Sequence, residues 1–577
     1  MAIPNLALIP TGYKAGKVYS VLPESGVGDF AFTRASEATR INSAGLLEVE
    51  ATGVPRLEYP LIDGVVNGCP SLLLENQATN LITYPISFGN PYWTKSGATI
   101  EGDPSTAGSE LLTGLNWVNS GSFGYETLTN NGDGKVVFSN TSGFGTATLS
   151  AGMVLGKTYL IEFTTGTGTY TQTRFQITSN VLEGASGQKF IILSPSTSYS
   201  FYITISTTNG ATPSDLGLWT NNGANDNGSI DAISIKEVQG YSSPSVDFPT
   251  SAFKLVEDTS TGSHRTTSVD WIFITGGTTA TQSAYVKANG RTIVGLQDLA
   301  LGAGHAVFNL STVTVLAVNG VSAKIETLVD GWFRISYTFV TGGVGSQPYK
   351  TGIFALDTYT TGAPLSYSYT GDGTSGIYLF MAQFEAGSYA TSPTLTSLTA
   401  EGTTTTRVAE VCNGAGDAST FNDSEGVLMA EISALANDGT YRLIQINDGT
   451  VNNMIAIGYT TISNQLLVEV RSAGGAIDNF TYTISDVLVN NKLSLKYKVN
   501  DVSLWVNGFE VQTITTATMP IGLSTLNFDY NNSTLPFYGK TKQIQYFNTV
   551  LTDAELETLT SWTSFISMAN SQNYNII

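Results

Sequence analysis

Tryptophans that stand beside polar side chains are the residues of this sequence best suited to bind a ligand. Trp219 lies in the segment GLWTNNGAND, just before Asn221 and Asn222. A sugar can stack its C–H face on an aromatic ring, while its hydroxyls need polar partners such as asparagine amides. Trp219 with the two asparagines is therefore a candidate glycan-binding site, and packing in a core is an equally open interpretation. Trp332 and Trp505 are further candidates, although the apolar predicted strand around Trp505 favours packing there.

Two acidic turns offer oxygen atoms of the kind that calcium prefers. They are NDNGSID, with Asp226 and Asp231, and GDGTSG, with Asp372. Calcium takes carboxylate and carbonyl oxygens from such loops. Asn, Asp and Gly also form turns without any ion. We expect no cofactor, and a calcium ion at these turns would be structural.

Carboxylates do not occur in the spacing that general acid–base chemistry needs. Glycoside hydrolysis requires two carboxylates close together, and sandwich glycosidases of the laminarinase type carry them as Glu-x-Asp-x-x-Glu on one strand. Here Glu431 and Glu469 each stand alone on a predicted strand. No Gly-x-Ser-x-Gly, Walker or His-Glu-x-x-His motif occurs. We therefore expect no enzyme. One alternative stays open, a glycan depolymerase whose carboxylates meet across a domain or subunit boundary.

Histidine and cysteine are too scarce for most metal or redox centres. The two histidines, His264 and His305, are expected to be structural, and Cys69 and Cys412 suggest no disulfide framework. The N-terminal segment lacks the pattern of a signal peptide, and no run approaches the roughly 18 apolar residues of a membrane-spanning helix. We expect no membrane insertion.

Composition predicts an all-β protein of several domains. The chain has 577 residues, too many for one core, and only 12% of them are charged against 41% hydrophobic. Abundant Gly, Thr, Ser and aromatic residues are typical of sandwiches with many turns. The net charge of −20 argues against nucleic acid and anionic membranes as partners, because phosphate contacts need Lys and Arg.

The pattern along the chain divides it into four parts. Residues 1–95 are punctuated by proline and are expected to be irregular. Residues 96–242 and 243–400 each predict a jelly-roll β-sandwich, with strands such as Thr158–Thr164 that nearly alternate apolar and polar residues. Residues 401–577 predict a third sandwich, of the concanavalin or laminin-G type.

The two predicted jelly rolls echo each other at their ends. The segment GSIDAISIKEVQGY of the first jelly roll corresponds to Phe380–Thr396 of the second, together with the residues just before it. The long spacing between the two segments indicates a repeated domain. The matching residues stand 148 positions apart: Gly228 and Gly376, Glu237 and Glu385, Tyr241 and Tyr389.

Ordered motifs in two regions resemble those of bacteriophage fibre and tail structural proteins. In the N-terminal part they are Arg34–Ser36, Pro55–Arg56, Leu72–Glu75 and Thr79–Leu81. In the second jelly roll and the tract after it they are Thr261–His264, Tyr285–Ala288, Asp330–Trp332, Glu385–Ser392 and Thr403–Arg407. For the charged residues Arg34, Arg40, Arg56 and Glu75 we expect salt bridges that pin the N-terminal segment rather than a ligand site.

Two further stretches are similar to known modules. NGSIDAISIKEV resembles the last strand of jelly-roll carbohydrate-binding modules. Ile544–Phe547, followed by TVLTDAELETLTSW, resembles the end of laminin-G-like domains, where a last strand precedes a short helix capped here by Thr552 or Asp553, with Glu555 near its start.

These resemblances imply a structural protein of a virion, a head or tail fibre or decoration. Its partners would be other virion proteins, further copies of the chain in a trimer or dimer, and host surface glycans held by several weak contacts. The N-terminal part would serve attachment or oligomerisation. A purely architectural virion protein without a ligand is the other alternative.

Overall fold

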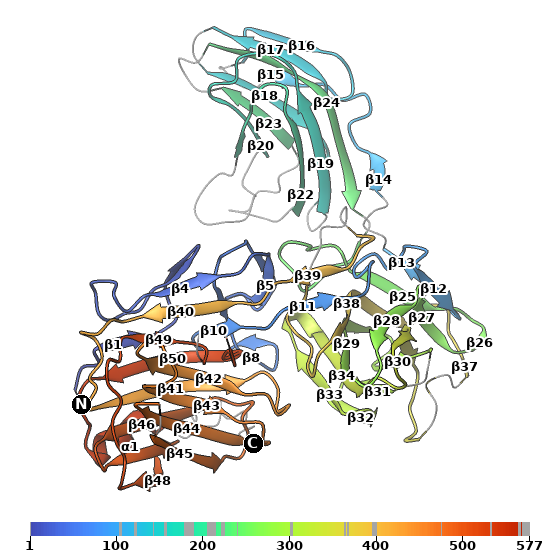
Figure 1. Cartoon of the computed structure of the whole chain (residues 1–577). Helices are drawn as coiled ribbons and strands as arrows, with labels where there is room; N and C mark the ends of the chain where they lie inside the picture. The colour runs from blue at the N-terminus through green and yellow to red at the C-terminus, as the bar shows by residue number, and fades with distance from the viewer. Residues whose placement is uncertain are drawn as a thin grey trace. The chain divides into compact units, whose positions relative to one another are not determined.

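The computed structural model is built mainly of β-strands, and its helical elements among the described residues include the short 3-10 turn Val329–Gly331 and the α-helix α1 (Asp553–Thr560) (Figure 1). The expected all-β fold class is therefore confirmed. The chain forms two compact units, residues 101–242 with 250–253, and the remaining described parts of 1–100, 243–249 and 254–577. The structure describes residues 2–102, 107–119, 124–141, 144–154, 158–177, 190–204, 215–220, 225–238, 240–300, 304–362, 365, 368–394, 401–474, 476–530, 534–563 and 567.

The smaller unit is a sandwich of two antiparallel sheets around one core. The first sheet has the order β16 (Thr127–Asn130), β17 (Val136–Asn140), β24 (Asp226–Val238), β19 (Thr158–Thr165) and β22 (Ser198–Thr204), with β14 (Ala107–Glu110) beside β24. The second has the order β15 (Val118–Asn119), β18 (Gly145–Ser150), β23 (Asp215–Thr220), β20 (Thr173–Ile177) and β21 (Phe190–Ile192). Inward-facing residues of both sheets, such as Ile161 and Leu218, fill the space between them.

A second sandwich, in the larger unit, corresponds to the second predicted jelly roll. One sheet has the order β12 (Trp93–Ser96), β27 (His264–Ser268), β36 (Thr351–Leu356), β30 (Ile293–Asp298), β31 (His305–Asn309) and β32 (Thr314–Asn319). The other has the order β13 (Ala98–Glu101), β25 (Phe253–Glu257), β38 (Gly376–Ala386), β29 (Thr279–Asn289), β34 (Trp332–Val340) and β33 (Ser322–Thr327). β24 and β38, which carry the two matching segments, are both interior strands of their sheets.

The C-terminal sandwich is built from an eight-stranded and a nine-stranded sheet. The first contains β48 (Phe509–Ile514), β47 (Val502–Val506), β46 (Asn491–Lys498), β41 (Glu425–Ala434), β50 (Gly539–Phe547), β10 (Ser71–Leu74) and β7 (Arg56–Glu58), with β1 (Leu6–Leu8) beside β50. The second contains β2 (Tyr13–Lys14), β3 (Lys17–Val18), β4 (Phe30–Thr33), β40 (Val411–Ala415), β49 (Thr525–Asn527), β42 (Arg442–Asn447), β43 (Met454–Tyr459), β44 (Gln465–Ser472) and β45 (Ala476–Thr483).

The N-terminal part differs from the irregular segment expected from sequence. Its strands β1, β7 and β10 complete one sheet of the C-terminal sandwich, and β2, β3 and β4 complete the other. Leu6, Phe30 and Leu72 are accordingly fully buried in the same core as Leu428. Short Pro-punctuated strands cannot bury a core alone, but as added strands they extend one that already exists.

A buried ion-pair cluster joins the N-terminal part to the chain that follows the second sandwich. We use this name for Arg34, Arg56, Glu75, Arg407 and Glu410. Arg56 lies 2.8 Å from Glu75 and also pairs with both carboxylate oxygens of Glu410, which Arg34 approaches to 2.8 Å. Arg407 lies 3.4 Å from Glu75. The expected salt bridges of Arg34, Arg56 and Glu75 are thus confirmed, and they link segments more than three hundred residues apart.

The closing segment of the second sandwich also reaches this cluster. The Ser392 backbone N–H donates to Glu75 at 2.9 Å. Glu385 is fully buried and accepts from Gln383 and from Thr391, whose backbone N–H lies 3.0 Å away. Motifs that are far apart in the sequence therefore meet in one polar core. Their structural role in this core accounts for the residue types found in them.

Candidate functional site

Trp332 and Trp505 are core residues, so Trp332 is not the glycan-binding platform that was considered, whereas for Trp505 the packing role favoured by its apolar strand is observed. Trp332 exposes 1% of its surface and Trp505 6%. Trp505 packs with Met429 and Leu556 beneath helix α1. A strand that is apolar on both faces can be covered on its outer face, and here the helix provides that cover.

Trp219 lies on the outer face of β23 and is half-buried. Its neighbours in the strand, Leu218 above all, point into the core, so the indole points away from it. The residues beside it in the sheet are Thr146 and Arg174. The indole Nε1 is buried and has no hydrogen-bond partner in the described part of the chain.

The partners expected for Trp219, Asn221 and Asn222, lie outside the described residues. The structure therefore places Trp219 beside the polar residues Thr146 and Arg174, and the glycan-binding site of Trp219 with the two asparagines stays a prediction.

The acidic turns carry structural hydrogen bonds. Burial alone would raise the pKa of Asp226, but hydrogen bonds from Thr171, Gln172 and Thr173 hold it below its ordinary value. Its oxygens already receive these donors, which come from a segment more than fifty residues earlier in the chain.

Asp372 and Asp231 also accept hydrogen bonds from nearby residues. Asp372 accepts from the Ser375 hydroxyl at 2.7 Å and from the backbone N–H groups of Ser375 and Thr374 at 2.7 and 2.8 Å, and these bonds lower its pKa. Asp231 is exposed and accepts from Ser229. Within the described ranges, no three His, Cys, Asp or Glu side chains are grouped to hold a metal ion.

His264 is a buried structural residue, as expected. It exposes none of its surface, its Nδ1 contacts the Gly97 carbonyl, and its Nε2 lies 3.2 Å from the Tyr369 carbonyl. Cys69 is exposed and Cys412 is buried, and neither forms a disulfide.

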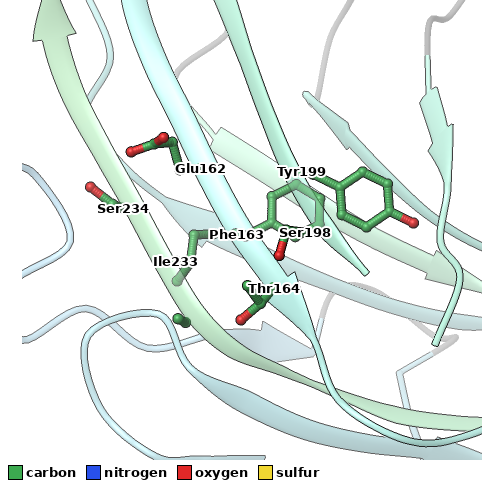
Figure 2. Close-up of a pocket in the computed structure, with 8 residues that line it drawn as sticks. Glu162, Phe163, Thr164, Ser198, Tyr199, Ile233 and Ser234 are labelled. Carbon is green, nitrogen blue, oxygen red and sulfur yellow. The ribbon is translucent and has the colours of Figure 1, made fainter. Parts of the chain in front are cut away.

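A shallow hollow of about 390 Å³ lies on the smaller unit, over β19, β22 and β24. Figure 2 shows Glu162 and Ser234 on neighbouring strands, where they pair in register. The rings of Phe163 and Tyr199 stack with centroids 4.7 Å apart. Phe163 is buried in the core. The hollow thus combines hydroxyls and one carboxylate with apolar side chains such as Ile233.

A second hollow, of about 330 Å³, lies beside β12 and β27 on the larger unit. We call it the cationic hollow, because an arginine and a lysine line it together with several hydroxyls. Thr94 and Thr267 pair across the two strands, as do Ser96 and Arg265. The lining residues are Thr94, Ser96, Arg265, Thr267, Ser268, Val269, Leu299 and Lys350.

Two exposed aromatic side chains lie near one another on the same sandwich, and one of them, Trp271, contacts a residue of the cationic hollow. Trp271 exposes 51% and Phe273 60% of their surface. They alternate with the buried Ile272, so both rings face outward from β28 (Ile272–Thr275), which pairs with β35 (Ser346–Tyr349). The Lys350 ammonium, which lines the hollow, lies 4.4 Å from the centroid of the Trp271 ring. We call Trp271 and Phe273 the aromatic platform.

Sequence reasoning missed this platform, although a signal was present. The segment DWIFIT places Trp271 and Phe273 on one face and Ile272 and Ile274 on the other. A strand that is apolar on both faces buries one of them and must cover or expose the other. Residue types alone do not say which face is buried, or whether the other face is covered or exposed.

No family model and no curated protein sequence matches the chain. Among solved structures, the NanB sialidase of Streptococcus pneumoniae is similar at 20% identity and a TM-score of 0.22, over 26% of each chain. The tandem CBM22 domains of Paenibacillus barcinonensis Xyn10C are similar at 10% identity and a TM-score of 0.18, over 49% of this chain and 99% of that one. Mouse laminin α1 domains LG4-5 are similar at 10% identity and a TM-score of 0.16, over 50% and 86%.

These likenesses are too slight to carry an argument about activity or ligand. The match spans only about a quarter of the sialidase. Among the described residues, no helix is both long enough and apolar enough to cross a membrane.

Proposed function

We propose that the chain is a non-catalytic, glycan-binding structural protein of a virion, and that the aromatic platform is its glycan-binding surface. The observation that carries the binding role is the pair of exposed rings, Trp271 and Phe273, beside a hollow lined by hydroxyls. Exposed aromatic faces stack on the C–H faces of sugars, and the adjacent hydroxyls supply partners for the sugar oxygens. No cofactor enters this proposal.

One pair of neighbouring buried carboxylates, Glu75 and Glu410, supports a non-catalytic role. Glu75 and Glu410 share Arg56, and their side chains expose 3% and none of their surface. A glycosidase needs its two carboxyl groups on either side of a bound sugar. Here an arginine occupies the space between them.

The virion role rests on the motifs of residues 32–93 and 261–407 that resemble phage fibre and tail proteins. In this proposal the chain assembles as a trimer or dimer with other virion proteins and holds host glycans through several weak contacts. Labelled antibody on purified particles tests the location, and absence of label from every particle would contradict it.

The binding role is tested with two matched substitutions. Phe273→Ala and Phe509→Ala each remove an exposed phenyl ring, 60% and 72% exposed, but Phe509 lies on the C-terminal sandwich. On a glycan array followed by titration, we expect Phe273→Ala and Trp271→Ala to weaken binding about tenfold, equivalent to about 1.4 kcal/mol.

We expect Phe509→Ala to bind as the parent does. Equal affinities for Phe273→Ala, Trp271→Ala and the parent would place binding elsewhere. An array without any binding would leave the purely architectural role.

A further inference from the structure

The cationic hollow carries two positive charges on a strongly acidic chain. The net charge is −20, yet Arg265 and Lys350 line the same hollow. The Arg265 guanidinium donates to the Ser263 hydroxyl at 2.9 Å and lies over the face of Phe354, with 5.4 Å between the guanidinium carbon and the ring centroid. The Lys350 ammonium lies over the Trp271 ring.

Neither charge is neutralised by an acid within the described residues. Burial lowers the pKa of Arg265, and no neighbouring carboxylate raises it. The arginines of the buried ion-pair cluster differ, because each of Arg34 and Arg56 faces Glu410. A half-buried cation without an acid partner bears a desolvation cost that an anionic ligand would offset.

The surroundings of the two cations fit a sugar rather than a bare anion. Thr94, Ser96 and Thr267 line the hollow with hydroxyls that can donate and accept. The half-exposed Trp271 ring, in contact with the Lys350 ammonium, continues this surface on its apolar side. Charge, hydroxyls and an aromatic face therefore lie side by side on one surface of the second sandwich.

We propose that the cationic hollow binds an acidic sugar residue, a uronic acid within a glycan chain. Its carboxylate lies against Arg265, whose planar fork suits two carboxylate oxygens, and near Lys350. Its hydroxyls meet Thr94, Ser96 and Thr267, and its neighbour along the chain stacks on the aromatic platform. This inference rests on the proposed function and names the class of glycan.

The ligand itself supplies the sharpest test. Calorimetric titration compares galacturonate and glucuronate tetrasaccharides with their methyl esters, which keep the ring faces and lose the charge. We expect the acids to bind at least about tenfold more tightly than the esters, a difference of about 1.4 kcal/mol, and to lose this advantage as salt rises.

Substitutions test whether the preference for the acids over the esters comes from the cationic hollow. Arg265→Gln and Lys350→Gln are expected to weaken binding of the acids more than that of the esters, and Arg265→Lys to restore only part of the loss. Lys324→Gln removes an exposed lysine that pairs with Glu326 on β33, and both ligands are expected to bind it as they bind the parent.

Each outcome separates the two proposals. Equal binding of acids and esters overturns the acidic-sugar inference and leaves glycan binding in place. Acid-selective binding that survives both Arg265→Gln and Lys350→Gln overturns the assignment to this hollow. Binding of neither ligand, with neutral glycans bound on the array, also overturns the inference alone.

Discussion

At the scale of single residues, the most constrained groups are the carboxylates of the buried ion-pair cluster. Glu75 exposes 2% of its surface and faces Arg56 and Arg407, while Glu410 accepts from the Glu75 backbone N–H at 2.9 Å. A buried ion is tolerated only when its partners and hydrogen bonds remain complete. Removing one member therefore leaves the others buried and uncompensated.

Glu75→Gln is expected to lower the free energy of unfolding by about 3–5 kcal/mol, the usual cost of breaking a buried ion pair by removing one partner. Denaturant titration measures it. The matched control is Glu425→Gln, which removes the partner of Lys498 in a largely exposed pair and should cost about 1 kcal/mol or less. Equal losses for the two variants would contradict a special role of the cluster.

The same carboxylate predicts a dependence of stability on pH. Burial alone raises the pKa of Glu75, but Arg407, Arg56 and the hydrogen bonds from Ser392 outweigh it and hold the pKa well below its ordinary value. A depressed pKa contributes stability above the unfolded value of about 4.3, and this contribution is lost as pH falls through the folded pKa. We expect unfolding free energy to fall steeply below about pH 4.

The control for this slope is Glu385, another fully buried carboxylate. Burial raises its pKa, and hydrogen bonds from Thr391 and Gln383 only partly oppose that shift. Glu75→Gln should therefore flatten the acid limb of the stability curve, whereas Glu385→Gln should not. Stability measured between about pH 2 and 7 distinguishes them.

Sequence reasoning was reliable for charged residues and unreliable for aromatic ones. Arg56 and Glu75 stand in apolar surroundings, where a charge must be paired, so their salt bridges could be predicted. Tryptophan is compatible with a core, a sheet face or a ligand site. Trp332 was therefore wrongly considered as a platform and the exposed Trp271 was missed, although packing was correctly favoured for Trp505, because burial depends on which element covers the strand.

At the scale of elements, local patterns predicted the strands and turns well. The expected strand Thr158–Thr164 is β19, which is one residue longer, and the tight turn between β46 and β47 has Asn500 at a positive φ of 59°. The expected cap of the last helix is also present, since Thr552 and Glu555 form a capping box. These features depend on neighbours within a few residues.

Pairing between distant strands could not be predicted in the same way. β1 pairs with β50, so that Leu6 lies opposite Tyr546, and β4 pairs with β40, so that Phe32 lies opposite Cys412. Such partners are selected by shape and burial in the assembled sandwich, and a single sequence carries no direct record of them.

Gly376, the first residue of β38 and one of the glycines matched between the two jelly rolls, gives a prediction at the scale of elements. A Cβ at this position would lie 1.8 Å from the Leu255 carbonyl oxygen, which is backbone and cannot rotate away. Gly376→Ala is therefore expected to force β25 and β38 apart and cost about 1–3 kcal/mol. Thermal or denaturant unfolding of the full chain measures the loss.

Gly262→Ala is the matched control, because Gly262 lies in the same sandwich, on β26 (Thr261–Gly262), and a Cβ there meets no atom within 4 Å. It should be close to neutral. A loss at Gly262 as large as that at Gly376 would show that general backbone effects, and not the contact with Leu255, decide the outcome.

At the scale of the whole molecule, the boundaries of folding units do not follow the order of the chain. The smaller unit is continuous apart from residues 243–249, and the described residues of its buried core run from Leu112 to Ile235. The C-terminal sandwich instead takes core residues from the first quarter of the sequence, including Leu8, Phe32 and Leu74. Sequence segmentation at residue 400 misses this, since it assumes that each domain is one stretch of chain.

This arrangement predicts which fragments fold. A fragment of residues 101–253 keeps every residue of its core and should unfold cooperatively by calorimetry, because a self-contained sandwich needs no outside strand. A fragment of residues 401–577 lacks β1, β7 and β10 from one sheet and β2, β3 and β4 from the other. It would expose the apolar faces that Leu6, Phe30 and Leu72 cover, so it should aggregate or unfold without a sharp transition.

Adding residues 1–95 in trans to the 401–577 fragment should restore a cooperative transition, because those strands supply the missing edges and Glu75 regains Arg407. The Glu75→Gln version of the added fragment should restore less, which ties the rescue to the buried ion-pair cluster. Cooperative unfolding of the 401–577 fragment alone would mean that the N-terminal strands decorate a complete sandwich rather than complete it.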